Sequence, residues 1–101
     1  MVKRKGWIEA ELYQKIARVM PLPCVDLIIR RPADGKILLT KRTVYPAKGK
    51  WWVPGGRVYK GEKLYDAVDR KAREEVGLSV RQVRCLGPVE FFFKKESRYC
   101  F

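Results

Sequence analysis

The chain has 101 residues, which is enough for one domain at most. Its hydrophobic residues (47%) and aromatic residues (12%) are too numerous for an intrinsically disordered chain. Lysine and arginine total 23 against 11 aspartates and glutamates. The resulting charge of +12 supports two interpretations equally, an anionic partner or a basic solvated surface.

The cysteines give an expectation about the compartment. Cys24, Cys85 and Cys100 are odd in number and form no CxxC pair, which argues against a disulfide framework and for a reducing environment. No apolar run is long enough to cross a membrane, and the first residues lack the apolar segment of a secretory signal. We therefore expect a cytoplasmic protein without a membrane partner.

The first predicted element is a helix. Between Trp7 and Met20 the apolar residues recur every three or four positions, and Pro21 follows. This spacing predicts an amphipathic helix over about residues 7–20. We expect its apolar side to pack on a sheet or on a second subunit.

Strand-like runs come next. Residues 23–31 and 36–42 are predicted strands, and Asp34-Gly35 between them is a typical turn sequence. Asp26 interrupts the first run, and alternation along a strand allows this carboxylate to lie on the solvated face. Residues 79–85 and 89–94 are predicted as further strands, separated by a break at Gly87-Pro88.

A glycine turn and a second helix occupy the centre of the chain. At Gly55-Gly56, glycine permits positive φ and a close approach of the backbone to a ligand. Helical rotation over residues 63–76 predicts an apolar stripe that faces a core: Leu64, Ala67, Val68, Ala72 and Val76. Four charged residues fall on the opposite side: Asp66, Asp69, Arg70 and Arg73. Gly77 fits the C-terminal cap.

Lys71 and Glu75 break this pattern, because both lie within about 20° of Leu64 on the apolar side. A carboxylate that is buried there needs a partner. One candidate is a metal ion, since magnesium takes oxygen ligands and the Gly55-Gly56 turn can add a backbone carbonyl. The other candidate is Lys71, which precedes Glu75 by four residues, the spacing of a helical ion pair.

Eight residues recur at fixed spacing over residues 56–78: Gly56, Glu62, Arg70, Ala72, Glu74, Glu75, Gly77 and Leu78. This pattern resembles the Nudix box, a motif with many fixed positions and therefore a specific one. One position differs, because Lys71 stands where the box has a glutamate.

Residues 21–78 are similar, within that family, to the GDP-mannose mannosyl hydrolases. The matching residues are Pro21-Leu22, Asp26, Leu38-Leu39, Lys41-Arg42-Thr43, Pro46-Ala47, Gly49, Trp51 and the segment 53–58. That subgroup also lacks the glutamate at the position of Lys71. It further lacks a glutamate at the position of Glu74, which this chain retains.

The resemblance implies an α+β fold, namely a Nudix-type α/β/α sandwich with a mixed sheet, in a single domain over residues 1–101. Nudix domains generally continue with more strands and a second packed helix, so we expect the C-terminal strands and helix of the family to be absent here. The N-terminal helix would help to form a homodimer and the nucleotide site. Trp7 and Tyr13 would then stack on the base, or else pack as plain interface aromatics.

The resemblance also implies a metal centre. Glu74, Glu75 and the carbonyl of Gly55 would hold one Mg²⁺ ion, with Mn²⁺ as the alternative. Lys71 replaces a negative charge by a positive one, which should discourage a cluster of several metals.

The predicted substrate and catalytic residues overlap. Arg42 and Arg57 would hold the phosphates, a task that suits bidentate guanidinium contacts. Asp26 would contact the substrate, and Arg57, Asp26 and Arg70 are the predicted catalytic residues. Arg70 would orient the glutamates, or else form a helix ion pair with Glu74.

The general base is missing from this scheme. In the subgroup it is a histidine, and this chain contains none. Glu90 and Glu96 are candidate substitutes, but their spacing supports neither. We therefore expect weak or absent catalysis by this chain alone.

Three functions follow as hypotheses. The first is Mg²⁺-dependent hydrolysis of a nucleoside diphosphate sugar, most specifically GDP-mannose, by attack of water at the anomeric carbon to release GDP and sugar. The second is pyrophosphohydrolysis of another nucleoside diphosphate derivative, which the Glu74-Glu75 pair favours and Lys71 disfavours. The third is a non-catalytic module that binds a nucleotide or, as the less favoured partner, a nucleic acid.

Overall fold

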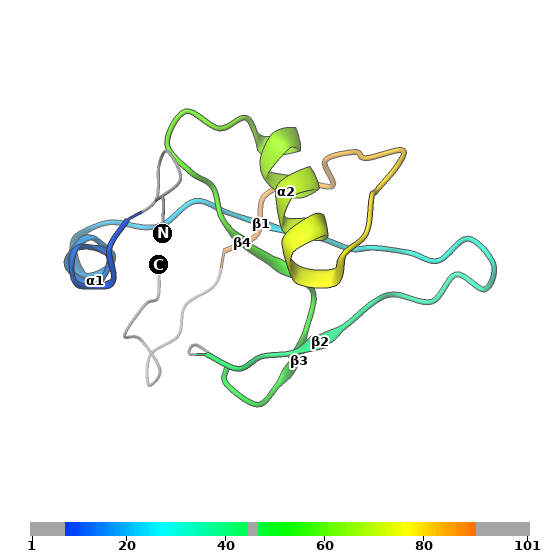
Figure 1. Cartoon of the computed structure of the whole chain (residues 1–101), viewed down its shortest axis with the longest axis horizontal. Coiled ribbons are helices and arrows are strands. Elements are labelled where there is room, and N and C mark those ends of the chain that lie inside the picture. Colours follow the sequence, from blue (N-terminus) through cyan, green and yellow to red (C-terminus); the bar gives the residue numbers. More distant parts are fainter. Residues whose placement is uncertain (1–7, 45–46, 91–101) are drawn as a thin grey trace.

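The computed structural model describes residues 8–44 and 47–90 (Figure 1). The described residues form two helices and four short strands, in the order α1, β1, β2, β3, β4, α2. This is the predicted α+β class. The described strands form two antiparallel pairs, β1 with β4 and β2 with β3. A mixed sheet needs a parallel pair, and none of the described strands forms one.

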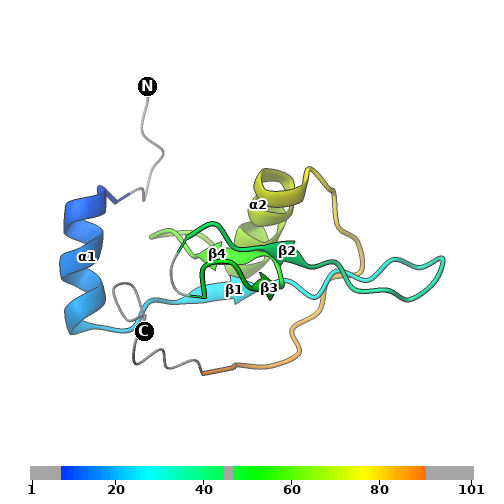
Figure 2. The same ribbon diagram turned by 90° about the horizontal axis from the view of Figure 1, so that it is seen from below.

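The first helix, α1, spans Ala10–Val19. It is shorter than the predicted 7–20, and Trp7 lies outside the described residues. No residue of α1 is buried, and the side chains of Leu12 and Val19 are largely exposed. Figures 1 and 2 both show the helix beside the rest of the fold, not on a sheet. Packing on a sheet is therefore wrong for the described residues, and packing on a second subunit stays a prediction.

The pair β1–β4 brings two predicted site segments together. β1 (Cys24–Asp26) lies antiparallel to β4 (Gly55–Arg57), with Asp26 opposite Gly55. The N–H of Leu27 donates to the carbonyl of Pro54 at 2.8 Å, which extends the pairing beyond the strands. Gly55 and Gly56, predicted as a turn, are therefore part of a strand, and they lie against the strand that carries Asp26.

The pair β2–β3 is shorter still. β2 (Thr40–Lys41) lies opposite β3 (Trp51–Trp52). The predicted strands 23–31 and 36–42 are thus each reduced to a short core, with one further bridge between Arg30 and Ile37. The predicted turn is confirmed, because Gly35 has φ +71° and the Arg31 guanidinium pairs with Asp34.

The second helix, α2, spans Leu64–Val76 and packs on β4 and β1 (Figure 2). Ala67 and Ala72 are fully buried, whereas Leu64 at the start of the predicted stripe is 59% exposed. The C-cap is confirmed: Gly77 has φ +67°, and its N–H donates to the carbonyl of Arg73 at 3.1 Å. The helix thus meets the sheet through methyl groups.

The chain after α2 differs from the prediction. Residues 79–85 form no strand, because a strand needs a neighbouring backbone and no described segment pairs with them. Of the predicted strand 89–94, residues 89 and 90 are not in a strand and the rest lies outside the described residues. Neither described helix is long and apolar enough to cross a membrane.

Candidate active site

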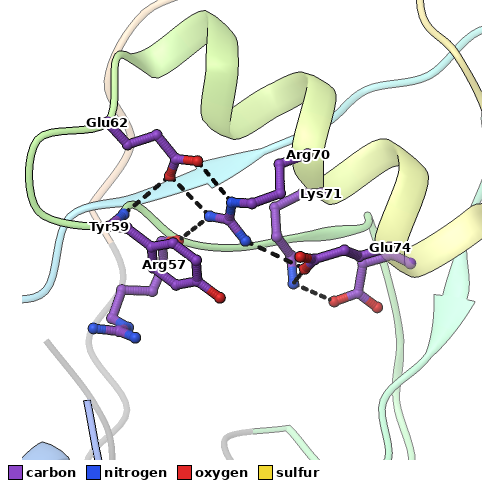
Figure 3. A network of polar contacts seen from close by, with 7 residues as sticks. Arg57, Tyr59, Glu62, Arg70, Lys71 and Glu74 are labelled. Atoms are coloured by element: carbon purple, nitrogen blue, oxygen red, sulfur yellow. Dashed lines mark hydrogen bonds and ion pairs between the residues drawn. The ribbon is translucent and has the colours of Figure 1, made fainter. Parts of the chain in front are cut away.

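Arg70 is the centre of the polar network (Figure 3). Its guanidinium donates to both carboxylate oxygens of Glu62, with Nε–Oε2 at 2.7 Å and Nη2–Oε1 at 2.9 Å. It also donates to the carbonyl of Arg57 at 2.9 Å and to Oε2 of Glu74 at 3.2 Å. The side chain is 15% exposed, so its assignment to the solvent side was wrong. Helical rotation places Arg70 about 120° from Leu64, away from the stripe, but its long side chain reaches the carbonyl of Arg57 in β4.

Glu62 is held on two sides. Besides Arg70, it accepts a hydrogen bond from the backbone N–H of Tyr59 at 3.0 Å. The Tyr59 ring in turn lies 3.8 Å from the Arg70 guanidinium, a cation–π distance. Arg70 therefore makes the contacts on which both of its predicted roles depend, one to a glutamate outside the helix and one to Glu74 four residues on.

The pH dependence of stability follows from this pair. The Arg70 hydrogen bonds hold the pKa of Glu62 below its usual range, although partial burial opposes them. A lowered carboxyl pKa contributes stability that is present above the unfolded value, about 4.3, and is lost as the pH falls through the folded value. We expect the free energy of unfolding, measured by urea denaturation, to be level from pH 7 to about 5 and to fall below about 4.3.

The matched variant for this experiment is Glu62→Gln. Asp34 also has a lowered pKa, because of its Arg31 pair, whereas burial raises the pKa of Asp26. Both contributions remain in the variant, so the difference between the two pH profiles isolates Glu62. Parallel profiles for the two proteins would contradict the prediction.

The Arg57 guanidinium lies within cation–π distance of two tyrosine rings. Its guanidinium carbon is 5.2 Å from the ring centre of Tyr13 in α1 and 5.2 Å from that of Tyr59. The structure thus places one predicted base-stacking residue, Tyr13, beside one predicted phosphate-binding residue. Sequence reasoning missed Tyr59, and the available signal was an aromatic residue between the glycine turn and Glu62.

Positive charges gather around β1. Burial and the negative charge of Asp26 raise the pKa of the Cys24 thiol, while Arg57, Arg42 and Lys71 oppose this shift. Burial likewise raises the pKa of Asp26, and Arg42 opposes it. Asp26 nevertheless lies at the solvated side of its strand, one of the two positions that alternation allowed. Three cationic side chains therefore act on the same short strand.

Lys71 fills the space over Gly56 of β4. Its Nζ is 2.7 Å from Oε1 of Glu75 and 3.8 Å from Oε2 of Glu74. A Cβ on Gly56 would lie only 2.6 Å from Cε of Lys71, so the lysine depends on a glycine here. Gly55 and Gly56 do not have the predicted positive φ. Instead, Gly56 allows the close approach of Lys71, and Gly55 allows the close approach of β1.

A comparison with protein families identifies the family to which the chain belongs. A model of the NUDIX domain matches residues 20–101. The chain belongs to the Nudix family. Three relatives are similar to it over parts of their length. The low-salt glycan biosynthesis protein Agl8 of Haloferax volcanii is 44% identical over 80% of this chain and 51% of that protein.

The other two relatives carry names of hydrolases. The ADP-ribose pyrophosphatase of Methanocaldococcus jannaschii is 45% identical over 86% of this chain and 47% of that protein. The 8-oxo-dGTP diphosphatase of Buchnera aphidicola is 37% identical over 63% of this chain and 57% of that protein. The chain spans about half the length of the first two of these three relatives.

Nudix hydrolases generally use divalent metals, so the fit of this Nudix site to a metal can be tested. Glu74 and Glu75 are already paired with cations, and no group of three or more metal-binding side chains occurs among residues 8–44 and 47–90. A hard divalent ion takes six or more oxygens, in part from water and substrate. The two carboxylates as arranged here therefore do not fit a metal, because Lys71 holds the position between them.

The Nudix site residues are thus only partly assembled in the described chain. Arg57 contacts the rings of Tyr13 and Tyr59, Arg70 lies over the Tyr59 ring, and Gly55 lies opposite Asp26. Two predicted residues are not described, Trp7 and the candidate base Glu96. The other candidate base, Glu90, is exposed.

Proposed function

We propose that the protein to which this Nudix domain belongs hydrolyses a nucleoside diphosphate sugar, most specifically GDP-mannose. The observation that carries the proposal is the contact of the Arg57 guanidinium with the rings of both Tyr13 and Tyr59. A nucleotide whose nucleobase stacks on the Tyr13 ring would have its phosphates within reach of the Arg57 guanidinium. The glycan-biosynthesis name of one relative supports a sugar substrate.

The reaction breaks the bond between the anomeric carbon and the diphosphate oxygen. Water forms the new bond to that carbon, its proton passes to a base, and GDP leaves with the electron pair. Arg57 and Arg42 would stabilise the charge that develops on the leaving diphosphate, because fixed guanidinium groups bind phosphate oxygens in pairs. The proposal assigns the base to no described residue.

Magnesium, with manganese as the alternative, remains a prediction from the resemblance. The proposal assigns it no step, because Lys71 lies between the carboxylates that would bind it. A homodimer through α1 is also proposed, and the exposed apolar residues of that helix support it. A cytoplasmic location is proposed on the cysteines, since Cys24 and Cys85 are free thiols.

Ligand binding is the direct test of this proposal. GDP-mannose at 100 times its dissociation constant should add about 2.7 kcal/mol to the free energy of unfolding, by mass action. That increase corresponds to a rise in Tm of roughly 10 °C for a domain of this size. Thermal unfolding with and without GDP-mannose measures it.

Two arginine variants make the test specific. Arg57→Met should abolish the rise in Tm, whereas Arg81→Met, at an exposed arginine outside the site, should leave it unchanged. An equal rise in both variants would contradict the role of Arg57. No rise in the wild-type chain would contradict the nucleotide-sugar site.

A second candidate function is pyrophosphohydrolysis, favoured by the retained Glu74 and by the relative named ADP-ribose pyrophosphatase. Product analysis separates the two. GDP and free mannose indicate attack at carbon, whereas GMP and mannose 1-phosphate indicate attack at phosphorus. A non-catalytic role in nucleic-acid binding would instead appear as affinity that falls steeply with salt.

A further inference from the structure

The contacts of Lys71 are those of a bound cation. Its ammonium group is 2.7 Å from Glu75 and 3.8 Å from Glu74, and its side chain is 15% exposed. It lies over Gly56: a Cβ added to that glycine would be 2.9 Å from Nζ of Lys71. We infer that Lys71 is a built-in cation that occupies the divalent-metal position of this Nudix site, so that the site works without a bound metal.

The charge around Lys71 supports this inference. Glu74 has a second positive neighbour, since Arg70 Nη1 lies 3.2 Å from the same oxygen, Oε2, that faces Lys71. Arg70 also pairs with Glu62, so the three carboxylates of this cluster share two basic groups of the same helix, and Lys71 is the one in contact with Glu75. A divalent ion at this position would meet the ammonium charge at close range and would have to displace it.

Gly56 of β4 makes the arrangement possible. A Cβ at position 56 would lie 2.6 Å from Cε and 2.9 Å from Nζ of Lys71, so it would shift the end of the lysine side chain from this place. The tether also gives the ammonium group a high effective concentration, because it is part of the same chain as its carboxylates. A free ion has to compete with a cation that cannot diffuse away.

Lys71 would also affect how the site binds phosphate, an effect that rests on the proposed function. Lys71 supplies positive charge beside Arg57 and Arg42, which act with it on Cys24. The diphosphate of a substrate should therefore bind in the presence of a chelator. GDP affinity should differ by less than about twofold between EDTA and excess Mg²⁺, because the cation is already present.

Direct metal binding tests the inference without any nucleotide. The electron paramagnetic resonance signal of free Mn²⁺ reports how much ion the chain binds. We compare the wild-type chain with Lys71→Met, Lys71→Glu and, as the matched control, Lys63→Met, which removes an exposed lysine next to the same helix.

The expected order of affinity is specific. Lys71→Met should bind Mn²⁺ at least about tenfold more tightly than the wild type, since the competing charge is gone. Lys71→Glu should bind more tightly still, because three carboxylates then converge, and Glu75→Gln in that background should reverse the gain. Lys63→Met should behave as the wild type. Wild-type affinity equal to that of Lys71→Glu overturns the inference.

Circular dichroism establishes that each variant is folded. If a Lys71 variant fails to fold, the wild-type titration still decides: tight Mn²⁺ binding that Glu75→Gln abolishes overturns the inference. Lys71→Arg, which keeps the charge, should bind no more Mn²⁺ than the wild type. The proposed function fails separately, by the absence of GDP-mannose binding at any Mn²⁺ concentration.

Discussion

Gly55→Ala is expected to separate β1 from β4 and to unfold the site. A Cβ at position 55 would overlap the backbone carbonyl oxygen of Val25 and lie 3.1 Å from Cα of Asp26. These are backbone atoms of the paired strand, so they can move only if the strand moves. We expect the free energy of unfolding to fall by about 3 kcal/mol, the upper end of the usual cost of overpacking.

The matched control is the neighbouring glycine. A Cβ at Gly56 would meet Cε of Lys71 at 2.6 Å, which is the flexible end of a long side chain. Gly56→Ala should therefore cost clearly less stability than Gly55→Ala, although both replace a glycine of the same strand. Urea denaturation of the two variants measures the difference. Equal losses, or a larger loss in Gly56→Ala, would show that the β1–β4 contact is not as close as described.

Arg70→Ala is expected to remove the interaction that connects α2 to the segment before it. The variant loses two charged hydrogen bonds to Glu62 and one to the carbonyl of Arg57. It leaves Glu62, whose side chain is 14% exposed, with its charge unpaired by Arg70. Breaking a largely covered ion pair costs about 3 kcal/mol. This corresponds to a decrease in Tm of roughly 12 °C or more in a domain of this size.

Arg73→Ala is the control for Arg70→Ala on the same helix. Arg73 forms an i,i+4 pair with Asp69 at 2.8 Å, but the two side chains are 67% and 42% exposed. Exposed pairs contribute about 0–1 kcal/mol, because solvent screens them. Thermal unfolding of both variants should therefore separate them by roughly 8 °C or more. Similar Tm values for the two variants would contradict the prediction that the largely covered Arg70 contacts stabilise the domain more than the exposed Arg73 pair.

The local part of this fold was readable from the sequence. The periodicity of residues 63–76 predicted α2 to within one residue at its start, and Gly77 predicted its end. Asp34-Gly35 predicted the turn, and the spacing of Lys71 and Glu75 gave their ion pair as one of two alternatives, the other being a metal ion. Each of these features depends on residues within four positions of one another, so the sequence contains the information that decides them.

The long-range part was not readable. Residues 79–85 have the composition of a strand but no described pairing partner, and no sequence pattern states whether a partner exists. Arg70 was assigned to solvent because helical rotation ignores side-chain length, and its guanidinium reaches Glu62 and Arg57. For Glu75 the sequence allowed two partners, a metal ion or Lys71. The described geometry shows the ion pair.

The two alanines at 0% exposure on α2 have a consequence for recognising related sites by sequence. Ala67 and Ala72 bring the helix axis near the sheet, so a lysine at position 71 is long enough to end over Gly56. A bulkier residue at either position would move the helix away from the sheet, and the ammonium group would no longer reach Gly56. A small residue at 67 and 72, a basic residue at 71 and a glycine at 56 thus form a four-position signature. It can be sought in genomes to find Nudix chains that use their own lysine where others use an ion.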